Sequence, residues 1–133
     1  MIHFDTSFVV DVLRESRHGG GPATSFMSSL PTDGVAISMF VSCELLAGAA
    51  LAHRGEEERQ RARNFFSQVR IVYPDGDFAE TYAAIVAAAR RSGRNSGIMD
   101  LLIATAAVRE KARLVTRDRK DFLDVAGLEL ILY

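Results

Sequence analysis

Hydrophobic and polar positions alternate along the chain in a way that predicts short buried strands separated by helices. The expected strands are residues 1–4, 34–38, 70–73, 113–116 and 128–133. The expected helices are residues 6–15, 23–30, 39–53, 56–69, 77–93, 97–112 and 119–125. Strands that alternate with helices over short connections favour a parallel sheet that is covered on both faces. We therefore expect an α/β fold, a three-layer α/β/α sandwich with a central, mainly parallel sheet of four to five strands.

The size of the chain is that of one domain, which we place at residues 1–133. Hydrophobic residues make up 48% of the sequence, enough for a substantial core. No apolar run approaches the roughly 18–20 residues that a membrane-spanning helix needs, and the N-terminus lacks the pattern of a signal peptide. A single cysteine, Cys43, excludes an internal disulfide, and we expect it to pack in the core. A cytosolic protein that does not enter a membrane is the expectation.

Three acids fall at places that a parallel sheet brings together. Asp5 follows the first strand directly, and Asp118 comes two residues after the strand at 113–116. The carboxyl ends of parallel strands meet at one edge, where such sheets bind their ligands. Asp100 lies in the first turn of a predicted helix, inside the apolar run "IMDLLIATAA". Burying an unpaired carboxylate there would cost several kcal/mol or more, so we expect a compensating partner.

Glu44 is a fourth acid in apolar surroundings. Its neighbours at three and four residues along the predicted helix are Phe40, Val41, Ala47 and Gly48, all apolar or small. We therefore expect Glu44 to lie on a buried face, close to the other three acids.

A cluster of four carboxylates needs cations or protons. Two like charges about 4 Å apart repel by roughly 4 kcal/mol at an effective dielectric constant near 20. Oxygen ligands favour hard cations such as Mg²⁺ or Mn²⁺, and open coordination positions suit phosphate chemistry. Taken singly, Asp5 could instead cap a helix, and Asp118 could be a turn residue. The net charge of −1 also means that a polyanionic partner must be held by local basic patches or by metal ions.

Four stretches carry a resemblance to a known family: "FDTSFVVDVLRE", "SCELLAGA" (42–49), "GIMDLLIATAA" (97–107) and "LVTRDRKDF" (114–122). In this order and at these separations, they resemble the PIN-domain family. The chain is most similar to the VapC-type ribonuclease toxins of bacterial and archaeal toxin–antitoxin pairs. The resemblance covers essentially the whole chain.

The resemblance implies a set of site residues. The family's acidic quartet, which binds one or two Mg²⁺ or Mn²⁺ ions, corresponds to Asp5, Glu44, Asp100 and Asp118. Its supporting hydroxyls and a further acid correspond to Thr116, Thr6, Ser7 and Asp121. Basic side chains that could hold RNA lie next to this set, at Arg117, Arg119, Lys120, Arg91 and Arg94.

The resemblance also implies an activity and partners. It implies metal-assisted hydrolysis of RNA that leaves a 5′-phosphate and a 3′-hydroxyl, with tRNA or rRNA among the substrates of relatives. A cognate antitoxin is expected to insert into an apolar groove near the active site, formed by the helices at 6–15, 23–30 and 39–53. A homodimer is likewise implied.

Other classes of protein stay open at this point. A parallel-sheet phosphoryl-transfer enzyme would need a second Asp two residues after Asp5, where this chain has Ser7. A receiver-like protein would be phosphorylated on Asp75, although the early acid pair is missing. A PIN-fold interaction module without catalysis is the non-enzymatic alternative.

Overall fold

The strands form one sheet in which neighbours pair in parallel throughout. The computed structural model describes residues 1–123 and 125–133. Its strands are β1 (Ile2–Phe4), β2 (Val35–Ser38), β3 (Arg70–Val72), β4 (Arg113–Val115) and β5 (Glu129–Ile131). Their order across the sheet is β3-β2-β1-β4-β5, with β1 at the centre. The predicted parallel sheet is therefore confirmed, and the carboxyl ends of all five strands lie at one edge.

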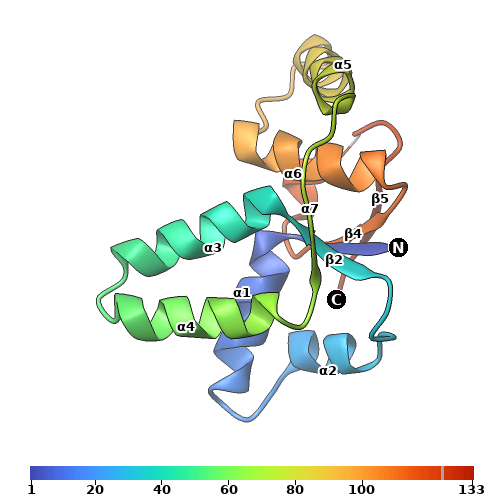
Figure 1. Cartoon of the computed structure of the whole chain (residues 1–133). Helices are drawn as coiled ribbons and strands as arrows, with labels where there is room; N and C mark the ends of the chain where they lie inside the picture. Colours follow the sequence, from blue (N-terminus) through green and yellow to red (C-terminus); the bar gives the residue numbers. More distant parts are fainter. Residues whose placement is uncertain (124) are drawn as a thin grey trace.

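Helices cover both faces of this sheet (Figure 1). They are α1 (Thr6–Ser16), α2 (Pro22–Ser28), α3 (Met39–Leu51), α4 (Gly55–Phe66), α5 (Phe78–Arg91), α6 (Ile98–Arg109) and α7 (Arg119–Phe122). In Figure 1, α5 and α6 lie above the sheet, α1 and α2 lie below it, and the α3–α4 pair extends to the left of the strands. This is the predicted three-layer sandwich. In the part of the chain that the structure describes, no helix is long and apolar enough to cross a membrane.

Aromatic packing fixes the end of the central strand. Phe4 and Phe8 are fully buried, and their ring centroids lie 4.7 Å apart. The ring of Phe65 on α4 also packs against Phe4, with the centroids 6.4 Å apart. Such contacts add about 0.5–1.5 kcal/mol to the free energy of burial. The junction between β1 and α1, which carries Asp5, therefore rests on a rigid base.

Helix α6 is held from two sides. Ile103, Ala104 and Ala107 are buried in the main core beneath the sheet-facing side of the helix. Leu101 is buried in a second, smaller cluster with Ile85 of α5. The first turn of α6, where Asp100 lies, is thus positioned by packing on both faces.

The structure departs from the predicted elements mainly at their ends. The last strand ends at Ile131 rather than at 133, and α7 ends at Phe122 rather than at 125. Hydropathy locates the buried middle of an element but not the residue at which its last hydrogen bond forms. Asp124, within that predicted helix, lies outside the described residues.

The prediction was wrong about one face of α3. Cys43, expected in the core, is exposed. Glu44 is half-buried, and its neighbours Ala47 and Gly48 are exposed rather than buried. Because α3 is apolar on almost all sides, its pattern does not reveal which side meets the core. The core side carries Val41, and Glu44 lies at the border between core and solvent.

Candidate active site

Asp5 lies at the carboxyl end of β1, directly beside the end of β4. The two strands pair in register, with Phe4 opposite Val115. The backbone amide of Asp5 donates a hydrogen bond to the carbonyl of Val115 at 2.9 Å. This register places Asp5 next to residues 116–118, as the parallel arrangement predicts.

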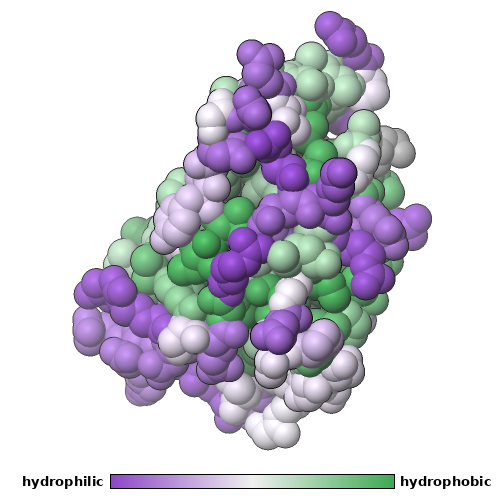
Figure 2. Space-filling view, turned by 45° about the vertical axis from the view of Figure 1, so that its right-hand side comes forward, coloured by the Kyte–Doolittle hydropathy of each residue, from purple (hydrophilic) through white to green (hydrophobic). Residues whose placement is uncertain are grey.

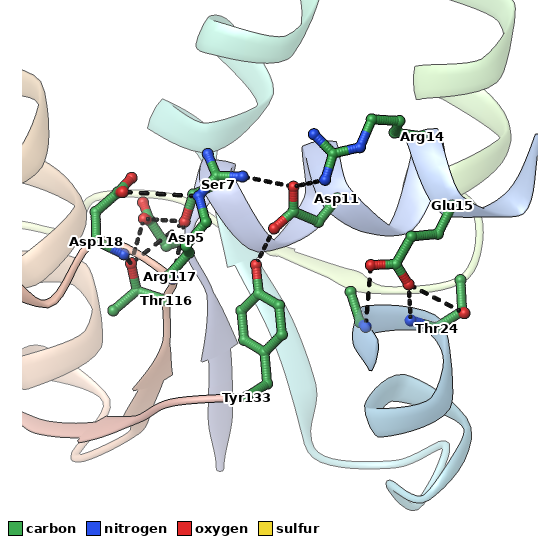
Figure 3. A network of polar contacts seen from close by, with 11 residues as sticks. Asp5, Ser7, Asp11, Arg14, Glu15, Thr24, Thr116, Arg117, Asp118 and Tyr133 are labelled. Atoms are coloured by element: carbon green, nitrogen blue, oxygen red, sulfur yellow. Dashed lines mark hydrogen bonds and ion pairs between the residues drawn. The ribbon is translucent and has the colours of Figure 1, made fainter. Parts of the chain in front are cut away.

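Two hydroxyl groups hold the carboxylate of Asp5 (Figure 3). Ser7 Oγ donates to Oδ2 at 2.9 Å, and Thr116 Oγ1 donates to the same oxygen at 2.7 Å. Asp5 is the N-cap residue of α1, but its side chain makes no capping hydrogen bond. Burial raises the pKa of Asp5, because its side chain is only 4% exposed, and the two hydroxyl hydrogen bonds offset part of that rise.

The segment after β4 brings Asp118 to the same place. The backbone amide of Asp118 donates to Oγ1 of Thr116 at 2.9 Å, so this hydroxyl group connects Asp118 to Asp5. Asp118 is partly exposed, and its electrostatic repulsion contributes to the raised pKa of Asp5. The carboxylates of Asp5 and Asp118 therefore interact electrostatically across the ends of β1 and β4.

Glu44 reaches the site from α3. Thr6 Oγ1, one residue after Asp5, donates to Glu44 Oε1 at 2.6 Å. Helix α3 begins immediately after β2, the neighbour of β1, and Ser38 caps it by accepting from the amide of Val41. The short connection leaves α3 little freedom to move relative to α1, so the Thr6–Glu44 contact is fixed by the strand order.

Asp100 is surrounded by the other acids. Burial raises its pKa to about 6, and repulsion from Asp121, Asp5, Glu44 and Asp118 adds to the rise. The five side chains come from four segments of the fold, because Asp118 caps the short helix α7 that carries Asp121. The structure thus brings the four predicted acids and Asp121 together at one edge of the sheet.

The acids do not form a finished metal cage. Among the described residues, no three His, Cys, Asp or Glu side chains have the arrangement of a metal site. Asp5 and Glu44 instead accept hydrogen bonds from neighbouring hydroxyls. The donor set nevertheless fits a hard divalent cation, because Mg²⁺ typically takes one or two carboxylates directly and keeps several waters. The repulsion around Asp100 also favours a cation between these oxygens.

Asp11 is a buried acid that was not among the predicted site residues. It lies on α1 and is 3% exposed. Its carboxylate accepts hydrogen bonds from Arg117 at 2.6 Å, from Arg14 at 2.8 Å and from the hydroxyl of Tyr133 (Figure 3). Asp11 interrupts the apolar run "FVVDVL" much as Asp100 interrupts its own run, and this signal could have identified it.

The predicted RNA-binding side chains fall into different environments. Arg117 is engaged with Asp11, as described above. Arg119 and Lys120 are exposed on α7, next to Asp118. Arg91 is exposed and is the last residue of α5. Arg94 is half-buried in the loop between α5 and α6.

A groove between α1, α3 and α4 opens beside Thr6 and Glu44. Its apolar lining comes from Val10, Leu13, Leu45, Ala49 and Ala62, and its charged rim from Arg14, Arg17, Glu58 and Arg61. Figure 2 shows hydrophobic side chains gathered near the middle of one face of the molecule, with hydrophilic side chains around them. The predicted apolar groove near the site is therefore present. The prediction was wrong about one wall, because α4 rather than the helix at 23–30 lines it.

Asp75 lies away from the acid cluster. Arg109 Nη2 donates to both of its carboxylate oxygens at 2.6 Å. Arg109 is at the opposite end of α6 from Asp100, about 13 Å along the helix axis at 1.5 Å per residue. Among the described residues, Asp75 is thus paired with a base, away from the acids gathered around Asp100, which does not favour a receiver-like protein.

Comparisons with known proteins agree with this arrangement. The model of the PIN domain matches residues 2–128. Ribonuclease VapC2 of Rickettsia felis is 30% identical over 96 residues, which cover 72% of each chain. The crystal structure of VapBC2 from Rickettsia felis, bound to a DNA fragment from their promoter, superimposes with a TM-score of 0.90 at 25% identity, covering 100% of this chain and 99% of that one. A toxin–antitoxin complex from Klebsiella pneumoniae gives a TM-score of 0.72 at 25% identity, covering 98% and 96%.

An acid cluster at the carboxyl edge of a parallel sheet, in the fold of these relatives, defines the class. The chain belongs to the PIN-domain family and, within it, to the VapC-type ribonuclease toxins. Nucleases of this family are generally metal-dependent. The fold and family predicted from the sequence are confirmed, and the solved complexes of relatives support an antitoxin as a partner.

Proposed function

We propose that this protein is a metal-dependent endoribonuclease that hydrolyses RNA phosphodiester bonds as the toxin of a type II toxin–antitoxin pair. The observation that carries the proposal is the gathering of Asp5, Glu44, Asp118 and Asp121 around Asp100. A cluster of acids that repel one another is unfavourable in a protein whose only task is to fold. It is favourable once a divalent cation enters, and phosphodiester hydrolysis uses such cations.

The acids divide into inner and outer ligands. Asp5 and Asp100 would hold the ion or ions most directly, because both are fixed by packing at the strand edge. Glu44 and Asp118 would complete the set, and the exposed Asp121 would act through water. When bound, Mg²⁺ or Mn²⁺ lowers the pKa of a water molecule and neutralises charge that develops on the phosphate.

Hydroxyl groups of the chain orient the acids, and its basic side chains would bind the RNA. Thr116 and Ser7 fix the orientation of Asp5 through its Oδ2 atom, and Thr6 fixes Glu44. The exposed Arg119 and Lys120, next to Asp118, would hold the RNA backbone. Arg91 and Arg94 would contribute from the end of α5 and the loop that follows it. Attack of an activated water on the phosphorus, with the bond to the 3′ oxygen breaking, would leave a 5′-phosphate and a 3′-hydroxyl.

The proposal is tested by mapping RNA ends in cells. The wild type, Asp5→Asn and Asp33→Asn are expressed in parallel, and new 5′-phosphate ends are sequenced. Asp33 is an exposed acid in the loop before β2, so its variant controls for the loss of one negative charge. New ends should appear with the wild type and Asp33→Asn and vanish with Asp5→Asn. Equal cleavage by Asp5→Asn would overturn the proposed site, and the absence of new ends with the wild type would leave an interaction module as the better account.

The groove between α1, α3 and α4 is the proposed docking site of the antitoxin. It borders Glu44 at one end, so an inserted segment would also block the acids. Val10 lines the groove and is 41% exposed, and Tyr73 is an exposed hydrophobic residue outside it. Val10→Asp should abolish co-purification with the antitoxin encoded beside this gene, whereas Tyr73→Asp should preserve it. Retention of the complex in Val10→Asp would place the antitoxin elsewhere.

We also infer a homodimer that acts in the cytoplasm, where the RNA substrate is present. The exposed alanines of α5, Ala83, Ala84 and Ala88, allow a second copy to approach closely. Light scattering of the purified chain should give twice the monomer mass, and Ala84→Arg should give the monomer mass. A dimer that survives Ala84→Arg would show that another face is used.

A further inference from the structure

Arg117 lies between two residues of the candidate site and is tied to α1 at two points. Its backbone amide donates to Ser7 Oγ at 3.2 Å, and its Nη1 donates to Asp11 Oδ1 at 2.6 Å. The residue before it, Thr116, binds Asp5, and the residue after it is Asp118. Two contacts to one helix therefore fix the backbone on which both of these site residues are carried (Figure 3).

Asp11 is itself held rigidly. It is 3% exposed, and Arg14 and Tyr133 donate to its two oxygens from sides other than that of Arg117. A buried carboxylate with several charge-assisted hydrogen bonds keeps one orientation, because any rotation would leave a donor unpaired. Asp11 is thus a fixed point against which the guanidinium of Arg117 is set.

We propose that Asp11 and Arg117 are positioning residues: they fix residues 116–118 so that Thr116 and Asp118 meet Asp5 in the geometry that binds a divalent cation. This inference rests on the proposed function. It also changes the role of Arg117, which the sequence suggested as an RNA contact. In this account its guanidinium acts on the protein itself, and it does so before any RNA binds.

If Arg117 acted only through its charge, removing its side chain would change the cation affinity in one direction. If Arg117 is a positioning residue, the change would be in the opposite direction. Its Nε lies 3.8 Å from Asp118 Oδ1, so its positive charge repels a cation at the site. Removing only a charge would strengthen cation binding. Removing a positioning contact would weaken it, because partners that orient metal ligands typically contribute 10- to 100-fold to metal affinity.

The test measures Mn²⁺ affinity by calorimetry without RNA. Arg117→Gln should bind Mn²⁺ about tenfold more weakly than the wild type, the lower end of the range for such partners. Arg117→Lys keeps a positive charge on a long side chain that can pair with Asp11, and its Mn²⁺ affinity should fall by less. Arg119→Gln removes the same charge from an exposed neighbour and should bind Mn²⁺ as tightly as the wild type or more tightly.

Asp11 is tested with a matched control on the same helix. Asp11→Asn should weaken Mn²⁺ binding about tenfold. Glu15→Gln disturbs a different set of hydrogen bonds, those from the amides of Ala23 and Thr24 to Glu15, and should leave Mn²⁺ binding unchanged. If Asp11→Asn fails to fold, Arg117→Gln decides alone, since the Arg117 side chain is 50% exposed and lies outside the core.

Two outcomes would overturn the inference in distinguishable ways. If the wild type binds Mn²⁺ and Arg117→Gln binds it equally or more tightly, the positioning role is wrong and the proposed function stands. If the wild type and Asp5→Asn both fail to bind Mn²⁺, the proposed metal site is wrong, and the positioning role falls with it.

Discussion

Charged side chains are arranged in opposite ways at the two edges of the sheet. At the amino edge, an acid meets a base: Arg70, at the start of β3, donates to Glu110 at 2.8 Å. At the carboxyl edge, acids meet acids around Asp100, and hydroxyls are the partners of the most buried one. The sequence has nearly equal numbers of acids and bases, so this separation is a property of the fold and not of composition.

The difference shows which edge serves function. Paired charges at a surface stabilise the fold slightly or not at all, and their loss is tolerated. Like charges held together reduce stability, and they persist where the protein needs them for binding or catalysis. The carboxyl edge is therefore strained electrostatically until a cation binds, whereas the amino edge is complete without one.

The largest expected effect comes from the carboxyl edge. Asp100→Asn keeps the shape of the side chain but removes a charge that would hold the ion, so RNA cleavage should fall by about 10²-fold or more. The measurement is the single-turnover rate on RNA cleaved by the wild type, with Mg²⁺ present. EDTA should abolish wild-type cleavage in the same assay. A wild-type rate in EDTA would remove the functional difference between the edges.

The next-largest expected effect concerns the stability of the folded protein. Asp100→Asn, which should impair cleavage, should increase this stability. Because the pKa of Asp100 is raised to about 6, the folded protein binds a proton more tightly than the unfolded chain does. Stability without metal should therefore fall as the pH rises from about 4 through about 6. Asp100→Asn removes this contribution and should be more stable than the wild type at neutral pH. The gain should be about 1 kcal/mol, which allows for solvent screening of a half-exposed group.

Urea unfolding of both proteins in EDTA checks this prediction. The two stabilities should converge near pH 4 and separate at neutral pH. His3, whose pKa is lowered by burial, is present in both proteins, so the difference between them isolates Asp100. A wild type that is as stable as the variant at neutral pH would show that the acids at the carboxyl edge do not repel.

The smallest expected effect comes from the amino edge. Glu110→Gln breaks the ion pair with Arg70, whose side chain is 51% exposed, so stability should fall by only about 0.5 kcal/mol. RNA cleavage should stay at the wild-type rate. A large loss of cleavage in this variant, with stability nearly unchanged, would contradict the division of roles between the edges.

The elements and the four acids could be predicted because local signals mark them. Alternation of apolar and polar positions gave the strands and helices in the right order, and the rule for parallel strands brought Asp5 and Asp118 to one edge. Asp100 was marked by the apolar run around it, of which Leu101, Ile103 and Ala104 are buried. Each of these signals lies within a few residues of the position it predicts.

The partners of Asp11 and the position of Glu44 could not be predicted, because they depend on contacts between segments that are distant in the sequence. Asp11 is paired with Arg117 and Tyr133, 106 and 122 residues away, and no local pattern indicates such partners. Glu44 was placed on the wrong kind of face because α3 is apolar on nearly every side. Its actual place, at the end of a groove, is decided by how α4 packs on α3.

The most direct test of the account is the titration of Asp100 itself. The carboxyl carbon of Asp100 can be followed by NMR as a function of pH, first in EDTA and then with Mg²⁺. We expect a pKa of about 6 for Asp100 without metal, against an ordinary value of 3.8, and a pKa well below 6 when Mg²⁺ is added. An ordinary pKa in EDTA that does not respond to Mg²⁺ would contradict the claim that these acids are gathered to bind a cation.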